Sequence, residues 1–192
     1  MDDVIVLRKM RFSQRFSEEF KIPIEKLNPF FENEFKPCLI GKADLKEEIK
    51  KYLKEWGWKK SADDLLEYWF KTESSLDKKM LDSASRLRQK GINCYLCTNQ
   101  EKYRVNYNFK KLGLNKYFDG IFYSAKIGHK KQEPEFWQEV YKILKFPDKK
   151  TVLFWDNSKD KLEAAKEFGF NTELYTSFKD YENKIKKYIT KN

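Results

Sequence analysis

From Gly91 onward the sequence alternates short apolar segments of strand length with segments of helical periodicity. The strand-like segments are residues 92–98, 120–124, 151–156 and 172–175. The helix-like segments are residues 101–112, 134–145, 159–168 and a terminal amphipathic stretch. Because strands that alternate with helices through short loops form parallel β-α units, this half predicts a doubly wound α/β layer. We expect residues 92–98, 120–124 and 151–156 to be neighbouring parallel strands.

The part of the chain before Gly91 has helical patterns only. Apolar residues recur at helical spacing in two stripes, Phe12, Phe16 and Phe20, and then Leu45, Ile49, Leu53 and Trp56. Ser61 with Asp64 resembles a capping box at the start of a third helix, and a fourth helix is expected over residues 75–89. The sequence therefore predicts an all-helical lobe at about residues 11–85 that precedes a Rossmann-like half.

The charge pattern argues against a nucleic-acid partner, although the net charge is +10. The 40 Lys and Arg residues mostly alternate with acidic residues along helix-like segments, as in residues 42–51, which is typical of a solvated helix face. No apolar run approaches the roughly 20 residues of a membrane helix, and the N-terminus lacks the apolar part of a signal peptide. We expect a soluble, cytoplasmic protein with no membrane partner.

The three cysteines are too few for a disulfide framework, and their odd number suits a reducing compartment. Cys94 and Cys97 have the spacing of a redox or zinc motif. They lie inside a predicted strand, however, and strand residues three apart point to opposite faces of a sheet. We therefore interpret them as core cysteines that cannot share a metal ion.

Polar residues follow the predicted strands where each one ends, at the edge where parallel sheets bind their ligands. Thr98 and Asn99 end the first strand, Lys131 follows the second, and Asp156, Asn157 and Asp160 follow the third. A hydroxyl, a lysine and oxygen ligands for Mg²⁺ at one edge describe a phosphoryl-transfer site. Taken singly, Thr98 could cap a helix, Lys131 could be solvated and Asp156 could belong to a turn.

Over nearly its whole length the sequence resembles the haloacid dehalogenase-like hydrolase superfamily. Leu96-Cys-Thr-Asn99 looks like motif II, and Lys131-Gln-Glu-Pro134 is similar to motif III, although Gln132 and Glu133 replace its usual Pro and Asp. Phe154-Trp-Asp-Asn-Ser158 looks like motif IV, where the family usually has Asp in place of Asn157. The helical segment resembles the family's small α-helical cap. The resemblance thus divides the chain into a core of residues 1–10 and 86–192 and a cap of residues 11–85.

Motif I of the family matches only in part. Met1-Asp2-Asp3 matches that motif from its second position onward, with Asp2 as its second aspartate and Asp3 where Gly is usual. On this interpretation the nucleophilic aspartate, and the central strand that it ends, would precede Met1. The alternative is that Met1-Asp2-Asp3 is merely a polar start.

The resemblance implies a Mg²⁺-dependent phosphatase that acts on a small phosphorylated metabolite through an aspartyl-phosphate. The catalytic residues would be Asp2, as general acid and base, together with Thr98 and Lys131. Thr98, Asn99 and Lys131 would also bind the phosphoryl group. The predicted metal ligands are Asp2, Asp156, Asn157 and Asp160. Aspartate at the second position of motif I favours a phosphatase over a dehalogenase, because an acid is useful only for an alkoxide leaving group.

Two other functions stay open at this point. The absent nucleophile and Asn157 would suit a catalytically inactive member that serves as a binding or scaffold protein. The basic charge would suit a nucleic-acid-binding protein. The sequence names neither the substrate nor the oligomeric state.

Overall fold

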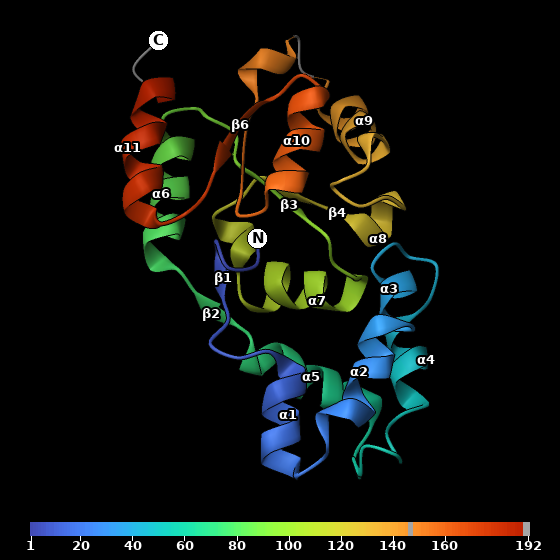
Figure 1. Cartoon of the computed structure of the whole chain (residues 1–192). Coiled ribbons are helices and arrows are strands. Elements are labelled where there is room, and N and C mark those ends of the chain that lie inside the picture. Colours follow the sequence, from blue (N-terminus) through green and yellow to red (C-terminus); the bar gives the residue numbers. More distant parts are fainter. Residues whose placement is uncertain (146–147, 190–192) are drawn as a thin grey trace.

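The structure is a computed structural model that describes residues 1–145 and 148–189. An α/β core and a helical cap are joined by two crossings of the chain, near the strands β1 (Val6–Leu7) and β2 (Ser75–Leu76) (Figure 1). This mixed architecture confirms the predicted fold class. In the described ranges no helix is long and apolar enough to cross a membrane.

The core strands form two parallel pairs. β3 (Tyr95–Thr98) pairs with β4 (Gly120–Tyr123), and β5 (Leu153–Asp156) pairs with β6 (Asn171–Leu174). Over the described residues no ladder joins β5 to β3 or β4, so the expectation that all three are direct neighbours is wrong for β5. A ladder needs two backbones side by side, and β6 is the described strand that forms one with β5. The central strand that the resemblance places before Met1 stays a prediction.

Alternating side chains show that both pairs belong to one layer. Leu96 of β3 and Trp155 of β5 pack in one apolar cluster with helices α6 (Lys78–Gln89) and α11 (Phe178–Ile189). Phe122 of β4 and Phe154 of β5 pack in the cluster on the other face. That face is covered by α9 (Pro134–Leu144) and α10 (Lys159–Glu167), which lie on the side away from α6 and α11 (Figure 1). The core is therefore a three-layer α/β arrangement, as predicted.

The two cysteines of the apparent metal motif point to different faces of this layer. Cys94 packs in the cluster with α6, and Cys97 packs in the cluster with α9. Burial raises the pKa of each of these thiols to about 11, so both stay protonated at neutral pH. The interpretation of Cys94 and Cys97 as core cysteines without a shared metal is confirmed.

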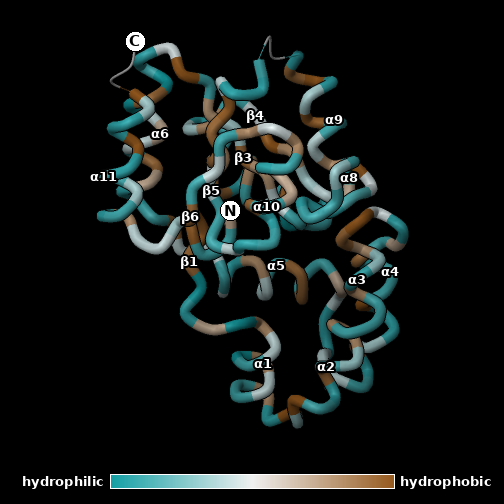
Figure 2. Tube along the Cα trace, turned by 45° about the horizontal axis from the view of Figure 1, so that its top comes forward, coloured by the Kyte–Doolittle hydropathy of each residue, from teal (hydrophilic) through white to brown (hydrophobic). Residues whose placement is uncertain are grey.

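The cap is built on aromatic side chains. Its helices are α1 (Phe12–Phe20), α2 (Ile24–Glu32), α3 (Phe35–Cys38), α4 (Leu45–Lys50) and α5 (Ala62–Thr72). Phe16 and Trp56 are fully buried at its centre, and Trp56 Nε1 donates to the Lys26 carbonyl at 3.1 Å. The predicted capping box is confirmed, because Ser61 Oγ accepts from Asp64 N at 3.1 Å and Asp64 Oδ2 accepts from Ser61 N at 3.1 Å. Brown, apolar segments face one another inside each lobe (Figure 2).

The segment after the cap differs from the expected helix over residues 75–89. Ser75–Leu76 forms β2, which pairs antiparallel with β1, and α6 begins only at Lys78 after its N-cap Asp77. The buried residues of α6, such as Met80 and Leu81, belong to the core cluster. The cap boundary at residue 85 stays a prediction, and this packing favours a boundary before Lys78.

The remaining elements lie in the core and along its border with the cap. They are α7 (Lys102–Asn106), a π-helical turn (Tyr107–Lys111), short turns at Leu114–Lys116 and Lys149–Thr151, and α8 (Ser124–Ile127). Tyr107 packs into the aromatic cluster of the cap, and Ser124 Oγ bonds to the Leu39 carbonyl. The cap therefore rests on α7 and α8, beside the ends of β3 and β4.

Candidate active site

The centre of the candidate site is a buried ion pair at the strand ends. Lys131 Nζ lies 2.5 Å from Asp156 Oδ2, and the two side chains are 4% and 3% exposed. Asp156 is the last residue of β5, and Lys131 lies on the loop between α8 and α9. Lys131 Nζ also donates to the Cys97 carbonyl at 3.2 Å, so it reaches from β5 to β3. Lys131 is therefore not the solvated lysine of the alternative interpretation.

Thr98 and Asn99 stand at the end of β3, next to this pair. The Asn99 side chain accepts from Lys131 N at 2.9 Å and donates to Gln132 Oε1 at 2.8 Å. Thr98 is 3% exposed, and its hydroxyl makes no hydrogen bond within the described ranges. It does not cap the next helix, because the N-cap of α7 is Glu101, whose carboxylate accepts from Tyr103 N and Arg104 N. The Thr98 hydroxyl is thus available to a ligand.

Gln132 is a site residue that the sequence marked only as a departure from the family pattern. Its amide nitrogen donates to Asp160 Oδ2 at 3.0 Å, while its amide oxygen accepts from Asn99. Asp160 also bonds to Ser158 Oγ, and these hydrogen bonds hold the pKa of Asp160 below its usual value. Gln132 therefore ties motif II to motif IV. No signal in the sequence separates such a bridge from an ordinary surface glutamine.

Asp156 has a second role in the turn that follows β5. Its Oδ1 accepts from Ser158 N at 3.0 Å, so the carboxylate both stabilises a turn and pairs with Lys131. The exposed Asn157 makes no contact with these groups among the described residues. The turn interpretation of Asp156 and the site interpretation are therefore compatible.

Asp2 is hydrogen-bonded to Gln100, two residues beyond the end of β3. Its Oδ2 accepts from Gln100 Nε2 at 2.6 Å, whereas Oδ1 is buried without a partner in the described structure. The Met1 carbonyl accepts from the amides of residues 4, 5 and 6, which makes a tight turn. The neighbouring Asp3 has φ +58°, a conformation that suits glycine, and the resemblance places the usual glycine there.

The Met1 α-amino group is buried among the charges of the site. Burial, followed by repulsion from Lys131, lowers its pKa to about 6, while Asp2 and Asp156 act in the opposite direction. The side chain of Met1 packs in the same cluster as Leu96 and Trp155. Met1 thus lies where the two strand pairs approach each other.

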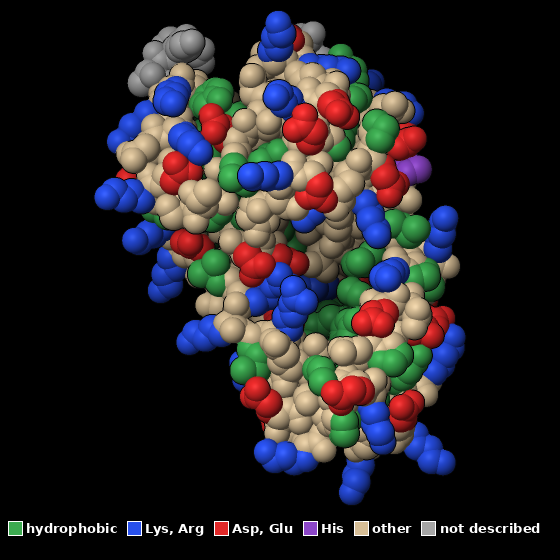
Figure 3. Space-filling view, viewed as in Figure 1, with side chains coloured by type: hydrophobic (Ala, Val, Ile, Leu, Met, Phe, Trp, Pro, Cys, Tyr) green, Lys and Arg blue, Asp and Glu red, His purple; other side chains and the backbone are tan. Residues whose placement is uncertain are grey.

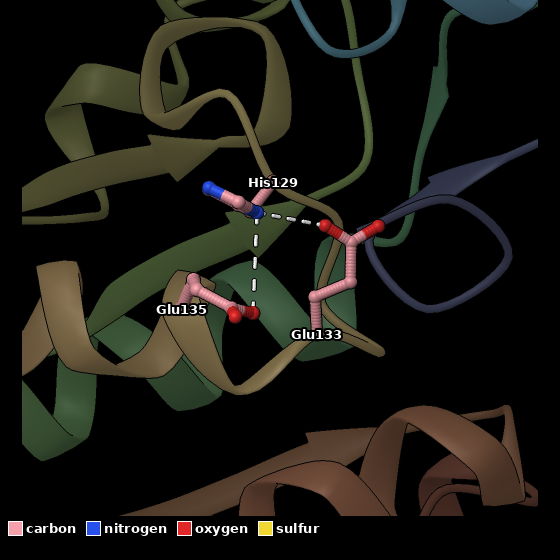
Figure 4. Close-up of side chains that lie close together, drawn as sticks. All are labelled: His129, Glu133 and Glu135. Carbon is pink, nitrogen blue, oxygen red and sulfur yellow. Dashed lines mark hydrogen bonds and ion pairs between the residues drawn. The ribbon is translucent and has the colours of Figure 1, made fainter.

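The predicted metal ligands do not form one compact cluster. In the described ranges, the His, Cys, Asp and Glu side chains whose ligand atoms all lie within 4.8 Å of one another are His129, Glu133 and Glu135 (Figure 4). His129 Nδ1 lies 2.9 Å from Glu133 Oε2, and all three side chains are 42–52% exposed. This arrangement is what exposed, hydrogen-bonded polar side chains before and at the start of α9 would give. The predicted set of Asp2, Asp156, Asn157 and Asp160 stays a prediction.

A cleft of about 240 Å³ lies between the core and the cap. Its core side is polar and includes Asp2, Arg8, Asn99, Gln100 and Arg104. Its cap side carries an apolar wall of Phe12, Phe31, Phe35, Leu39 and Trp69, together with the polar side chains of Arg11, Ser13 and Glu73. The space-filling view shows Lys and Arg side chains at the mouth of a hollow between the two lobes (Figure 3). Thr98, Lys131 and Asp156 do not line this cleft, so their meeting Asp2 in one cleft stays a prediction.

A second buried ion pair fixes the two crossings between core and cap. Arg104 of α7 lies 2.6 Å from Glu73, and both side chains are 4% exposed. Glu73 follows the last cap helix, and its other oxygen accepts from Phe12 N at the start of the first cap helix. Sequence reasoning missed these residues, because nothing local distinguishes Glu73 or Arg104 from the many surface charges around them.

Comparisons with known proteins give one consistent result. The family described as haloacid dehalogenase-like hydrolase matches residues 10–174. The HAD family enzyme bt-2542 from Bacteroides thetaiotaomicron has a similar fold, with a TM-score of 0.78, 19% identity, and 96% of this chain and 95% of that chain covered. Its wild-type complex with magnesium and inorganic phosphate gives a TM-score of 0.75, 21% identity and 95% of each chain covered.

A HAD-like family hydrolase from Porphyromonas gingivalis has a TM-score of 0.77 at 16% identity, over 98% of this chain and 94% of that chain. No curated protein matches the chain. The family match spans both lobes and includes the segments that carry motifs II, III and IV. The chain therefore belongs to the haloacid dehalogenase-like hydrolase family.

Proposed function

We propose that this hydrolase is a Mg²⁺-dependent phosphatase of a small phosphorylated metabolite. The observation that carries the proposal is the buried Lys131–Asp156 pair at the strand ends, next to Asn99, whose side chain accepts from Lys131 N. Lys131 would neutralise phosphoryl charge, and Thr98 and Asn99 would donate hydrogen bonds to the phosphoryl oxygens. The bt-2542 complex with magnesium and inorganic phosphate supports the same chemistry by analogy.

The residues present are compatible with a hard cation. Asp2 Oδ1 is a buried oxygen without a partner, and the Asp2 carbonyl accepts no hydrogen bond from the described residues. Asp2 and Asp156 would hold Mg²⁺, with Asn157 or Asp160 as further oxygen ligands. When bound, the ion would neutralise charge that develops on the phosphoryl oxygens.

In this proposal the nucleophile is an aspartate just before Met1, and Asp2 is the general acid and base. The test compares the 192-residue chain with a chain extended upstream by an apolar strand that ends in Asp. We expect Mg²⁺-dependent hydrolysis of p-nitrophenyl phosphate only from the extended chain. Changing the added Asp to Asn should abolish this activity, and Lys131→Ala should weaken it severely. Robust activity from the 192-residue chain that survives Asp2→Asn would contradict the proposal.

A catalytically inactive binding protein is the second candidate. It is favoured by the amide of Asn157 where the family usually has a carboxylate. Binding of inorganic phosphate with Mg²⁺, measured by calorimetry, combined with no turnover by the extended chain, would support this candidate over the phosphatase.

A further inference from the structure

The cap side of the cleft presents aromatic rings at close spacing. The ring centre of Trp69 lies 4.8 Å from Phe12, 5.5 Å from Phe31 and 5.4 Å from Phe35. All four residues line the cleft, and Trp69 is only 4% exposed. Rings that pack against one another keep their positions, so they offer a preformed apolar wall. Such a wall suits a flat, apolar group better than a flexible, polyhydroxylated one.

One cation of the cleft forms no ion pair with a residue that the structure describes. Of the three arginines that line it, Arg8 lies 2.6 Å from Asp3 and Arg104 lies 2.6 Å from Glu73. Arg11 is exposed and forms no ion pair with an acidic residue of the described structure. A guanidinium next to aromatic rings is well placed to bind a planar anion such as a carboxylate.

A buried donor of the same wall also lacks a partner. Trp69 Nε1 is buried and makes no hydrogen bond within the described ranges. Buried tryptophan N–H groups usually have an acceptor, and an unpaired one calls for an explanation. An acceptor oxygen on a bound molecule would provide it. Arg11 is thus an exposed cation beside this wall, and Trp69 Nε1 is a buried donor of the wall without a partner among the described residues.

We propose that the cleft accepts a phosphate ester whose alcohol part is a single flat, mainly apolar ring bearing a carboxylate or a similar acidic oxygen group. The ring would lie against Phe12, Phe31, Phe35 and Trp69, and the acidic group would reach Arg11. The cleft volume of about 240 Å³ limits the alcohol part to about one ring. This inference deepens the proposed phosphatase function and rests on it for the phosphate end of the substrate.

The test measures binding of alcohol products to the 192-residue chain, which requires no turnover. The probe is 4-hydroxybenzoate, which is flat and acidic. Phenol is flat without the acid, cyclohexanecarboxylate is acidic without the flat ring, and glycerol has neither feature. By isothermal titration calorimetry we expect 4-hydroxybenzoate to bind at least about tenfold more tightly than each of the others. Equal binding of all four probes would overturn the inference.

Variants assign the binding to the cleft. Arg11→Gln should weaken 4-hydroxybenzoate binding about tenfold, the loss typical of a charge-assisted hydrogen bond, and should leave phenol binding unchanged. Lys9→Gln is the matched control, because Lys9 is an exposed cation two residues away that does not line the cleft. Trp69→Phe keeps a ring and removes the N–H, and should weaken 4-hydroxybenzoate binding several-fold. Circular dichroism verifies that each variant is folded.

The results separate this inference from the proposed function. Equal effects of Arg11→Gln and Lys9→Gln would overturn the inference whatever the extended chain does with p-nitrophenyl phosphate. Selective binding of 4-hydroxybenzoate combined with no hydrolysis by the extended chain would uphold the ligand class and reject the phosphatase.

Discussion

Lys131 Nζ and Asp156 Oδ2, 2.5 Å apart, join the two strand pairs of the core at a place where no ladder of described residues joins them. Asp156 ends β5, and the same ammonium group donates to the Cys97 carbonyl in β3. The pair is almost fully buried, so each charged group is shielded from water and is stabilised by the opposite charge instead. This relationship gives the first prediction.

Lys131→Ala should lower the free energy of unfolding by about 3–5 kcal/mol, because it leaves Asp156 buried without its cation. Urea unfolding followed by circular dichroism measures the loss. Lys130→Ala is the control, since Lys130 is its neighbour and forms no ion pair with a described residue. The Lys131→Met/Asp156→Asn double variant should recover part of the loss, because it removes both charges. Equal stability of the Lys131→Ala and Lys130→Ala variants would show that the pair does not hold the core together.

Glu101 should make the free energy of unfolding fall as the pH rises, which is the opposite of the usual effect of a carboxyl group in a folded protein. Burial raises the pKa of its carboxyl from 4.5 to about 7 in the folded protein. Between these two values the folded state binds more protons than the unfolded state, so the free energy of unfolding falls as pH rises. The slope from this group should reach at most about 1.4 kcal/mol per pH unit.

Glu101→Gln tests this prediction. The variant cannot ionise, and it keeps one of the two oxygens that accept separately from Tyr103 N and Arg104 N. Urea unfolding at pH 5 and pH 8 should show a smaller decrease for the variant than for the parent chain. Glu135→Gln, at an exposed carboxyl in the first turn of α9, should leave the decrease unchanged. The same decrease in all three proteins would mean that Glu101 does not titrate in this range.

Gly41 should be required for docking of the cap on the core. It has φ +72°, and a Cβ atom there would collide with the Ala125 carbonyl of α8. Gly57 has φ +62° with no atom within 4 Å of the corresponding Cβ position, so it is the matched control. Gly57→Ala should cost only the conformational strain of about 1–2 kcal/mol. Gly41→Ala should cost more in urea unfolding, or should increase hydrogen exchange at residues 39–44 and 124–128. Equal costs and unchanged exchange would show that the contact is dispensable.

Asp3 should respond to substitution as a position that favours glycine. At φ +58° aspartate is tolerated better than alanine, and Asp3 also pairs with Arg8 at a partly exposed site. Asp3→Ala should therefore lower the free energy of unfolding by about 1–2 kcal/mol. Asp3→Gly should be close to neutral, because relief of strain offsets the loss of the ion pair, whose value is at most about 1 kcal/mol. Thermal unfolding measures both variants, and a larger loss for Gly than for Ala would refute the expected conformation.

The class of the fold and the order of its parts follow from local patterns along the chain. The alternation after Gly91 specifies β-α units, since a strand and a helix differ in the period at which apolar residues recur. The alternation of side chains along a strand likewise predicted that Cys94 and Cys97 point to opposite faces, and the two residues lie in different clusters. The aromatic spacing at Phe12 and Phe16 and the capping box at Ser61 are local signals of the same kind. Each depends on residues a few positions apart, and a sequence states such relations directly.

Which strand ends meet, and what lies between them, depends on contacts between distant parts of the chain. Three such contacts join residues that are distant in the chain. Among the described strands β5 pairs with β6, Gln132 connects Asn99 to Asp160, and Glu73 is buried against Arg104. Nothing within a few residues of Gln132 or Arg104 marks them, because a charged or amide side chain looks the same in a sequence whether solvent or a partner satisfies it. Burial and hydrogen bonding across elements arise only when the layers pack. For this reason the motifs predicted a phosphoryl-transfer site. The aromatic wall and the position of Arg11 beside it could be identified only in the folded structure.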